Sequence, residues 1–280
     1  MLEQVATRTA ESPAPSSAPT QAERFFFDTF GYLVLENFLS ADHVARLNEA
    51  LDRVIVQRRA EHAQGKVKTG MTHIKGEKST RIFYILGDDP LFLEMLDWPP
   101  IMPYVTTLLN AKPHHHASDA IVEVSSELNQ RGLGWHIDGH DNGFRILGRP
   151  VPLLQLKIGY YLSDMTEPNQ GNLTLVPGSH KSNEEPDPAD LKQGLFPGAI
   201  QVCAPAGSAI LFHNAIWHAG GPFTKPGGSR TMLYYAYEHP WMIASQEHWG
   251  YSPDFYNSLS PERRKLFHGF VFDPPEQRWG

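Results

Sequence analysis

SAILFHNAIWHAGGPFTKPGGSRTMLYYAYEH, residues 208–239, holds two apolar segments joined by a connection rich in glycine and proline. Short apolar segments rich in β-branched and aromatic residues, bounded by such turns, are typical of β-strands. The same pattern recurs from about residue 117, for example in AIVEVSSEL and LLQLKIGYYL. This spacing predicts a mainly β core over about residues 117–240, arranged as a sandwich or barrel.

Helices are expected on both sides of this core. Residues 22–31 predict a short helix ended by Gly31, and YLVLENFL, residues 32–39, predicts a strand. Ser40 is a good N-cap for an amphipathic helix that follows it. We therefore expect a helical N-terminal part to about residue 116. The segment SPDFYNSLSPERRKLFHGF predicts a C-terminal helical tail. Residues 1–22 read as a disordered leader because of their Ser, Ala, Pro and Thr content, which leaves 23–280 as a single domain.

The overall composition limits the classes of function. The chain of 280 residues has a formal net charge of −7 without a basic stripe, which argues against nucleic-acid binding. No apolar run reaches the length of a membrane span. The single cysteine, Cys203, excludes an intramolecular disulfide and fits a reducing cytoplasm, where we expect the protein to act. The oligomeric state stays open.

The stretch GWHIDGHDNGF, residues 134–144, concentrates imidazoles and carboxylates. In a strand, residues two apart face the same side, so His136 and Asp138 point together. His140 competes for the same role, but it lies beyond Gly139, where the strand is expected to end. The segment that opened this section offers a third ligand in His218, just before a turn. We expect His136, Asp138 and His218 to bind one metal ion.

A cation accompanies this group. Arg230 follows His218 by twelve residues, and two antiparallel strands joined by a turn would bring it back alongside. Two histidines and one carboxylate form the facial triad of non-haem Fe(II) oxygenases. 2-Oxoglutarate would occupy two of the open positions and O₂ the third. Arg230 would then bind the distal carboxylate of 2-oxoglutarate, because a guanidinium matches a carboxylate with two hydrogen bonds.

The sequence resembles the phytanoyl-CoA dioxygenase family of Fe(II)/2-oxoglutarate oxygenases. The resemblance rests on WHID, GNLTLVPGSH and HNAIWHAGG…SR in this order, and on the N-terminal FFFDTFGYLVLENFLSADHVARLNEAL; it spans about residues 24–237. It implies a double-stranded β-helix (a jelly roll, cupin-like) with flanking helices. It also implies Fe(II), 2-oxoglutarate and O₂ as cofactors, with His136, Asp138 and His218 as iron ligands and Arg230 as the 2-oxoglutarate anchor.

Two positions depart from the family pattern. Members often carry a hydroxyl residue two positions after the distal histidine, where this chain has Gly220, and Tyr160 stands where the family usually has tryptophan. Another group must therefore help to hold 2-oxoglutarate. The candidates, on strands expected to line the barrel, are Gln155, Lys157, Tyr160 and Thr174. Residues expected at the mouth of the site, and so beside a substrate, are His140, Asp141, Asn142, Arg145 and Tyr84.

These patterns favour a 2-oxoglutarate-dependent dioxygenase that hydroxylates a small or medium-sized metabolite and releases succinate and CO₂. Related halogenases replace the carboxylate ligand by a small residue, so Asp138 favours hydroxylation, desaturation or ring chemistry over halogenation. The alternatives are a non-catalytic jelly-roll metal-binding or sensor protein, and a Zn-dependent hydrolase, which would give Arg230 no task. The lysine-rich loop GKVKTGMTHIKGEKSTR is either a binding site for an anion such as coenzyme A or a solvated loop.

Overall fold

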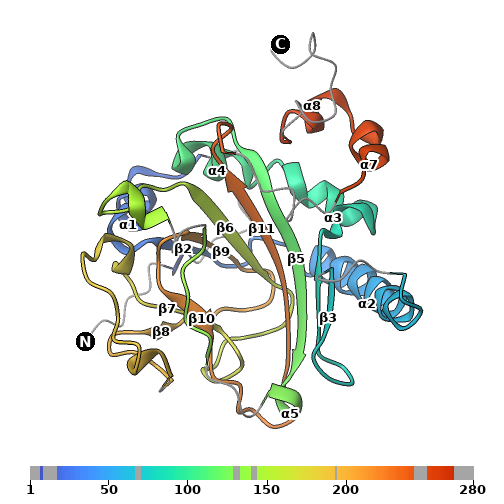
Figure 1. Cartoon of the computed structure of the whole chain (residues 1–280), viewed down its shortest axis with the longest axis horizontal. Coiled ribbons are helices and arrows are strands. Elements are labelled where there is room, and N and C mark those ends of the chain that lie inside the picture. The colour runs from blue at the N-terminus through green and yellow to red at the C-terminus, as the bar shows by residue number, and fades with distance from the viewer. Residues whose placement is uncertain are drawn as a thin grey trace.

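Two β-sheets form the centre of the molecule (Figure 1). The computed structural model describes residues 7–8, 18–66, 71–128, 133–139, 144–192, 194–242 and 251–267. In spatial order, the large sheet contains β1 (Thr7–Arg8), β2 (Tyr32–Leu35), β9 (Ala209–His213), β6 (Gln155–Tyr161), β11 (Ser229–Glu238), β5 (His114–Val124), β4 (Thr80–Phe83) and β3 (Thr72–Ile74). The small sheet contains β10 (His218–Gly220), β7 (Leu173–Leu175) and β8 (Ile200–Gln201).

The strands are antiparallel except for the β1–β2 pair, and the inner faces of the two sheets share one apolar cluster. This cluster joins residues such as Ile121 and Phe212 of the large sheet to Leu173 and Leu175 of the small sheet. Two antiparallel sheets closed over a common interior are the predicted jelly roll.

Helices cover the outer face of the large sheet (Figure 1). The helices on this face include α1 (Gln21–Phe30), α2 (Ala41–Ala63), α3 (Pro90–Glu94) and α4 (Met102–Leu109). The helices later in the chain are α5 (Ser125–Leu128), which follows β5, and α7 (Pro253–Ser258) and α8 (Pro261–Arg264). The largest apolar cluster joins side chains of α2, such as Leu47 and Leu51, to outward residues of the sheet, such as Ile158 and Tyr235. Alternation along each strand therefore gives the large sheet one face for the helices and one for the barrel interior.

The helix ends follow the predicted chemistry. Gly31 ends α1 with φ 81°, a left-handed conformation that glycine adopts without strain. Ser40 caps α2, and Ser260 caps α8 with Pro261 in its first turn. No helix among the described residues is both long and apolar enough to span a bilayer.

Two boundaries differ from the expectation. Helix α1 starts at Gln21 because Thr20 and Glu23 form a capping box, so order begins before residue 23, and Thr7–Arg8 already pairs with β2; most of the predicted leader lies outside the described residues. The N-terminal part is also less helical than predicted. Besides β2, which lies in the segment predicted as a strand, it contributes β3 and β4 to the large sheet.

Strand β5 contains a β-bulge. Ala117 pairs with Ala236 and His115 pairs with Tyr237, which leaves His116 as an extra residue between them. A bulge reverses the alternation of side chains on the residues beyond it. Asp119 and Ala117 line a cavity in the barrel and so does His116, whereas His115 packs outward on Tyr251 and Phe267.

Candidate active site

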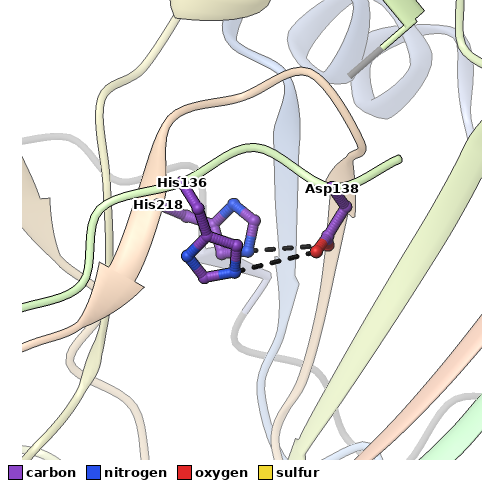
Figure 2. Close-up of side chains that lie close together, drawn as sticks. All are labelled: His136, Asp138 and His218. Atoms are coloured by element: carbon purple, nitrogen blue, oxygen red, sulfur yellow. Dashed lines mark ion pairs between the residues drawn. The ribbon is translucent and has the colours of Figure 1, made fainter. Parts of the chain in front are cut away.

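His136, Asp138 and His218 converge, with the side chain of His218 buried and that of His136 52% exposed, and Figure 2 shows both imidazoles directed at the carboxylate. The Nε2 atoms of His136 and His218 lie 3.7 and 3.5 Å from the oxygens of Asp138, and one possible ligand atom from each residue lies within 4.8 Å of the other two. Bonds of about 2 Å to one ion place its ligand atoms roughly 3–4 Å apart. The three side chains therefore fit a single metal ion.

The backbone holds the two histidines against each other. His136 and His218 exchange two backbone hydrogen bonds of 3.0 Å, which adds residue 136 to the edge of the small sheet beside β10. Asp138 is fixed by its own N–H, which donates to the carbonyl of Asn214 at 2.8 Å. The predicted same-side orientation of His136 and Asp138 follows from this extended geometry.

Hydrogen bonds also set the tautomer of each imidazole. Nδ1 of His136 lies 2.8 Å from the carbonyl oxygen of Gly134, and Nδ1 of His218 lies 3.0 Å from that of Ile216. A carbonyl only accepts, so each Nδ1 carries the proton and each Nε2 presents its lone pair towards Asp138. Burial lowers the pKa of His218 to about 3, which keeps this imidazole neutral, as metal binding requires.

A buried ammonium holds the carboxylate ligand. Lys157 on β6 donates to Oδ2 of Asp138 at 2.8 Å. Burial would raise the pKa of Asp138, but the positive charge and hydrogen bond of Lys157 outweigh it and hold this pKa well below its usual value. Burial would lower the pKa of Lys157, but Asp138 and Asp119 raise it above its usual value. Both groups are therefore charged, and Lys157 positions the carboxylate.

The residues that alternate with the ligands face outward and are covered by a loop. Trp135 and Trp217, each one position before a histidine ligand, pack against apolar residues of the segment 191–199. The ring of Phe196 meets Trp135 edge-on at 4.8 Å, and the indole N–H of Trp135 donates to the carbonyl of Gly194 at 2.6 Å. Part of the acidic, proline-rich stretch 181–198 thus packs behind His136 and His218.

Arg230 lies in the same interior as the triad. A cavity of about 550 Å³ is lined by His136, His218, Lys157 and Arg230, among other residues. Arg230 is buried, and its guanidinium donates to the hydroxyl of Tyr234 at 3.3 Å. A Cβ atom on Gly220 would lie 2.6 Å from Nη1 of Arg230. A side chain at position 220 would therefore crowd the guanidinium, and Gly220 leaves room for Arg230 in the conformation that it adopts here.

A buried carboxylate that the sequence analysis missed stands beside Arg230. Glu123 on β5 lies directly opposite Arg230 in the register of the sheet, 3.4 Å from Nη1, and accepts a hydrogen bond of 2.6 Å from Lys75. Burial would raise the pKa of Glu123, but Arg230 and Lys75 outweigh it and lower the pKa. Two cations around one carboxylate leave one positive charge, which matches one incoming carboxylate. A signal existed, because Asp119 and Glu123 alternate on one face of β5 together with Ile121.

A second cavity of about 180 Å³ adjoins Asp138 and Lys157 on their other side. Gln155 and Tyr84 line this smaller cavity rather than the larger one, and Arg81 lines both. Arg81, Asp119 and His116 also line this cavity, and the sequence patterns did not single them out. The bulge explains His116, because simple alternation along β5 would have turned it outward.

The structure does not bring Thr174 and Tyr160 to either cavity. On β7 the inward residue is Leu173, while the hydroxyl of Thr174 donates to the backbone of Asn172 at 3.1 Å. On β6 the inward residues include Gln155 and Lys157, and Tyr160 belongs to the cluster under the helices. Each of the two residues alternates with neighbours that line a cavity, so its side chain points to the other side of its strand.

The remaining mouth residues have mixed outcomes. His140, Asp141 and Asn142 lie outside the described residues. The guanidinium of Arg145 lies 5.3 Å from the ring centroid of Trp217 and pairs with Glu185 of the covering loop, which also pairs with Arg149. In this conformation Arg145 fastens the loop over the ligand strands.

Comparison with known proteins identifies the family. Residues 27–232 match the model of the phytanoyl-CoA dioxygenase (PhyH) family. The chain belongs to the phytanoyl-CoA dioxygenase family. This family places it among the Fe(II)- and 2-oxoglutarate-dependent oxygenases, as the sequence predicted. An ectoine dioxygenase of Stutzerimonas stutzeri is 26% identical to this PhyH-family chain over 260 residues, which cover 85% of the chain and 82% of the relative.

Solved structures share the fold. The 2-oxoglutarate-dependent carbocyclase SnoK from nogalamycin biosynthesis superposes with a TM-score of 0.64 at 19% identity, covering 90% of this chain and 95% of SnoK. EctD from S. alaskensis, crystallised with 2-oxoglutarate and 5-hydroxyectoine, gives 0.62 at 22% identity, covering 81% and 79%. These likenesses confirm the jelly roll. The predicted cofactors Fe(II), 2-oxoglutarate and O₂ are those of the PhyH family.

Proposed function

We propose that this PhyH-family protein hydroxylates a small or medium-sized metabolite. One atom of O₂ would enter a C–H bond of the substrate as a hydroxyl group. The other atom would enter the carboxylate formed when 2-oxoglutarate loses CO₂ and becomes succinate. Bound Fe(II) would supply the activation of O₂, which no protein side chain can provide. The observation that carries the proposal is the cluster of His136, Asp138 and His218 beside Arg230.

The side chains of the chain would bind and orient these components. The Nε2 lone pairs of His136 and His218 and one oxygen of Asp138 would hold the iron, while Lys157 keeps the carboxylate in place. Arg230 would bind the distal carboxylate of 2-oxoglutarate in a pocket already shielded from water, where a charge-assisted hydrogen bond is strong. Glu123 would orient the guanidinium and balance its charge.

Roles for the other predicted residues belong to the same proposal. Tyr84 would contact the substrate, since it lines the cavity next to Asp138. Gln155 would serve the substrate rather than 2-oxoglutarate, for the same reason. Arg145 would act through the covering loop. The names of the curated relatives support a small-molecule substrate, because two of them are ectoine dioxygenases.

The test is a titration of the protein with Fe(II) and 2-oxoglutarate without oxygen. We expect a weak visible charge-transfer band that saturates with 2-oxoglutarate, and succinate release after oxygen is admitted. His218→Ala should abolish both, while His62→Ala, which removes an exposed histidine, should leave them unchanged. A band of full strength in His218→Ala, or none in the wild-type protein, would contradict the proposal and favour a hydrolase or a sensor.

A further inference from the structure

The smaller cavity lies where a substrate would meet the metal site. It shares Asp138 and Lys157 with the surroundings of the triad, and it is separate from the larger cavity that contains Arg230. If 2-oxoglutarate occupies the Arg230 side, the space of about 180 Å³ on the other side of Lys157 is left for the second reactant. The residues that line this cavity therefore indicate the chemistry of the substrate.

One wall is an ion pair. Arg81 on β4 donates to Oδ2 of Asp119 on β5 at 2.5 Å, and its guanidinium lies 4.6 Å from the ring centroid of Phe83. The side chain of Asp119 is 5% exposed, and that of Arg81 is 33% exposed. A guanidinium and a carboxylate side by side offer several donors and acceptors in fixed positions, which suits hydroxyl, amino or carboxylate groups of a ligand.

The opposite wall is a hydrogen-bonded cluster. Nδ1 of His116 lies 2.8 Å from Glu238, and the amide of Gln155 lies 3.2 Å from both residues. Nine of the thirteen described residues that line the cavity are polar or charged, and the others are Phe83, Ala117, Gly139 and Ala236. A long alkyl chain would fill this space without using the donors and acceptors that face it, whereas a polar ligand could hydrogen-bond to them.

The backbone is specialised at two of the lining residues. Tyr84 has φ 58° and ψ 49°, a left-handed conformation that is an outlier for a bulky residue and is held by the hydrogen bond from its N–H to Ser118. His116 is the bulged residue of β5. Strained residues and bulges concentrate at functional sites, where they direct side chains that regular geometry would turn away. Two such features on one small cavity indicate a built binding site.

We infer that the cavity formed by Arg81, Asp119, Tyr84, His116 and Gln155 binds the primary substrate, and that this substrate is a small polar metabolite rather than a long-chain acyl thioester. The inference rests on the proposed function. A volume of about 180 Å³ corresponds to roughly six water molecules in the liquid and falls below the roughly 300–1,000 Å³ of sites for drug-sized ligands. Both the volume and the polarity of the cavity thus favour a small polar substrate.

The experiment is an untargeted search for the molecule that the enzyme oxidises. The Fe(II)-loaded full chain is incubated with 2-oxoglutarate, oxygen and a cellular metabolite extract divided into a small polar fraction and a lipid and acyl-thioester fraction. Mass spectrometry then finds compounds that disappear only with 2-oxoglutarate present. We expect depletion in the small polar fraction. Depletion in the lipid and acyl-thioester fraction, or in neither fraction, would overturn the inference.

Variants connect the identified compound to the cavity. Tyr84→Phe removes one hydroxyl but keeps the ring, and Asp119→Asn removes one charge; each should raise the KM for the compound at least fivefold. The dissociation constant of 2-oxoglutarate, measured by anaerobic titration, should stay within twofold. Unchanged KM values in both variants would also overturn the inference.

Matched controls show what mutation alone does. Tyr32→Phe changes a tyrosine that lines neither cavity, and Asp88→Asn breaks an arginine–aspartate pair with Arg58 at 2.8 Å that lies outside both. Neither should alter the KM. The anaerobic titration also separates the two levels of the argument. Absence of 2-oxoglutarate binding removes the proposed function itself, whereas binding combined with an acyl-thioester substrate removes only the inference about the cavity.

Discussion

The two sheets of the jelly roll are supported differently on their outer faces. The large sheet lies under α1–α4 in an apolar cluster of buried side chains, many of them completely inaccessible. The small sheet is covered by a loop, whose partly buried Leu191 and Phe196 rest on Trp135 and Trp217. His136 and His218 of the candidate metal site belong to the thinly covered side, whereas Arg230 and Lys157 belong to the large sheet. Stability and metal positioning should therefore be separable.

The largest expected effect is on the helix-covered side. Leu47 of α2 is completely buried, and Leu47→Ala should destabilise the fold by about 2–5 kcal/mol through lost burial and a cavity. Metal affinity should be unchanged under conditions where the variant is folded. Denaturant unfolding and an Fe(II) titration measure the two quantities. A loss of metal affinity as large as the loss of stability would show that the two sides are not independent.

Next in size is the response of 2-oxoglutarate binding. Arg230→Lys keeps the charge but loses the planar pair of donors, so the dissociation constant of 2-oxoglutarate should rise about tenfold to a hundredfold. Iron affinity should not change, because the ligands are on other strands. Arg53→Lys, at an exposed arginine on α2, is the control. Equal 2-oxoglutarate affinity in wild type and Arg230→Lys would remove Arg230 from the site.

The covering loop should control the metal more than the fold. Phe196→Ala removes the ring that holds Trp135 one residue before a ligand, and we expect iron affinity to fall about tenfold, as for groups that orient metal ligands indirectly. The melting temperature should fall less than in Leu47→Ala, since Phe196 is only partly buried. Leu195→Ala, an exposed neighbour, should change neither property. Unaltered iron affinity in Phe196→Ala would mean that the loop does not position the ligands.

The smallest effect concerns pH on the helix-covered side. Burial lowers the pKa of His115 to about 3, so the unfolded chain takes up a proton below about pH 6.5 that the folded chain does not. This residue therefore reduces stability as pH falls from 6.5 towards 3, by about 1.4 kcal/mol at pH 5.5. Between pH 7.5 and 5.5 the free energy of unfolding of His115→Phe should therefore decrease by about 1.4 kcal/mol less than that of the wild-type protein. Identical pH dependence in the two proteins would contradict this.

The residues of the candidate metal site could be predicted because the alternation of side chains along a strand is a local property of the sequence. Alternation in a strand aligns His136 with Asp138, and this rule holds in the structure. The expected hairpin between the strands of His218 and Arg230 does not form, because β10 pairs with β7 in the small sheet and β11 pairs with β5 and β6 in the large sheet. Arg230 instead reaches the cavity of His218 from the other sheet. Glu123 could have been found from the same alternation. Thr174 and Tyr160 line neither cavity, because their selection considered which strands line the barrel but not which face each strand presents to it. His116 was not predictable, because a bulge is set by the pairing of two distant strands.

That bulge has a consequence for how such proteins diversify. Removing a single residue near position 116 would restore regular alternation and exchange the imidazole in the barrel for its neighbour, while the rest of β5 kept its register. Relatives could thus acquire a different group beside the substrate through a short deletion rather than through a substitution. Sequence alignments that treat this strand as ungapped would then compare side chains that point in opposite directions.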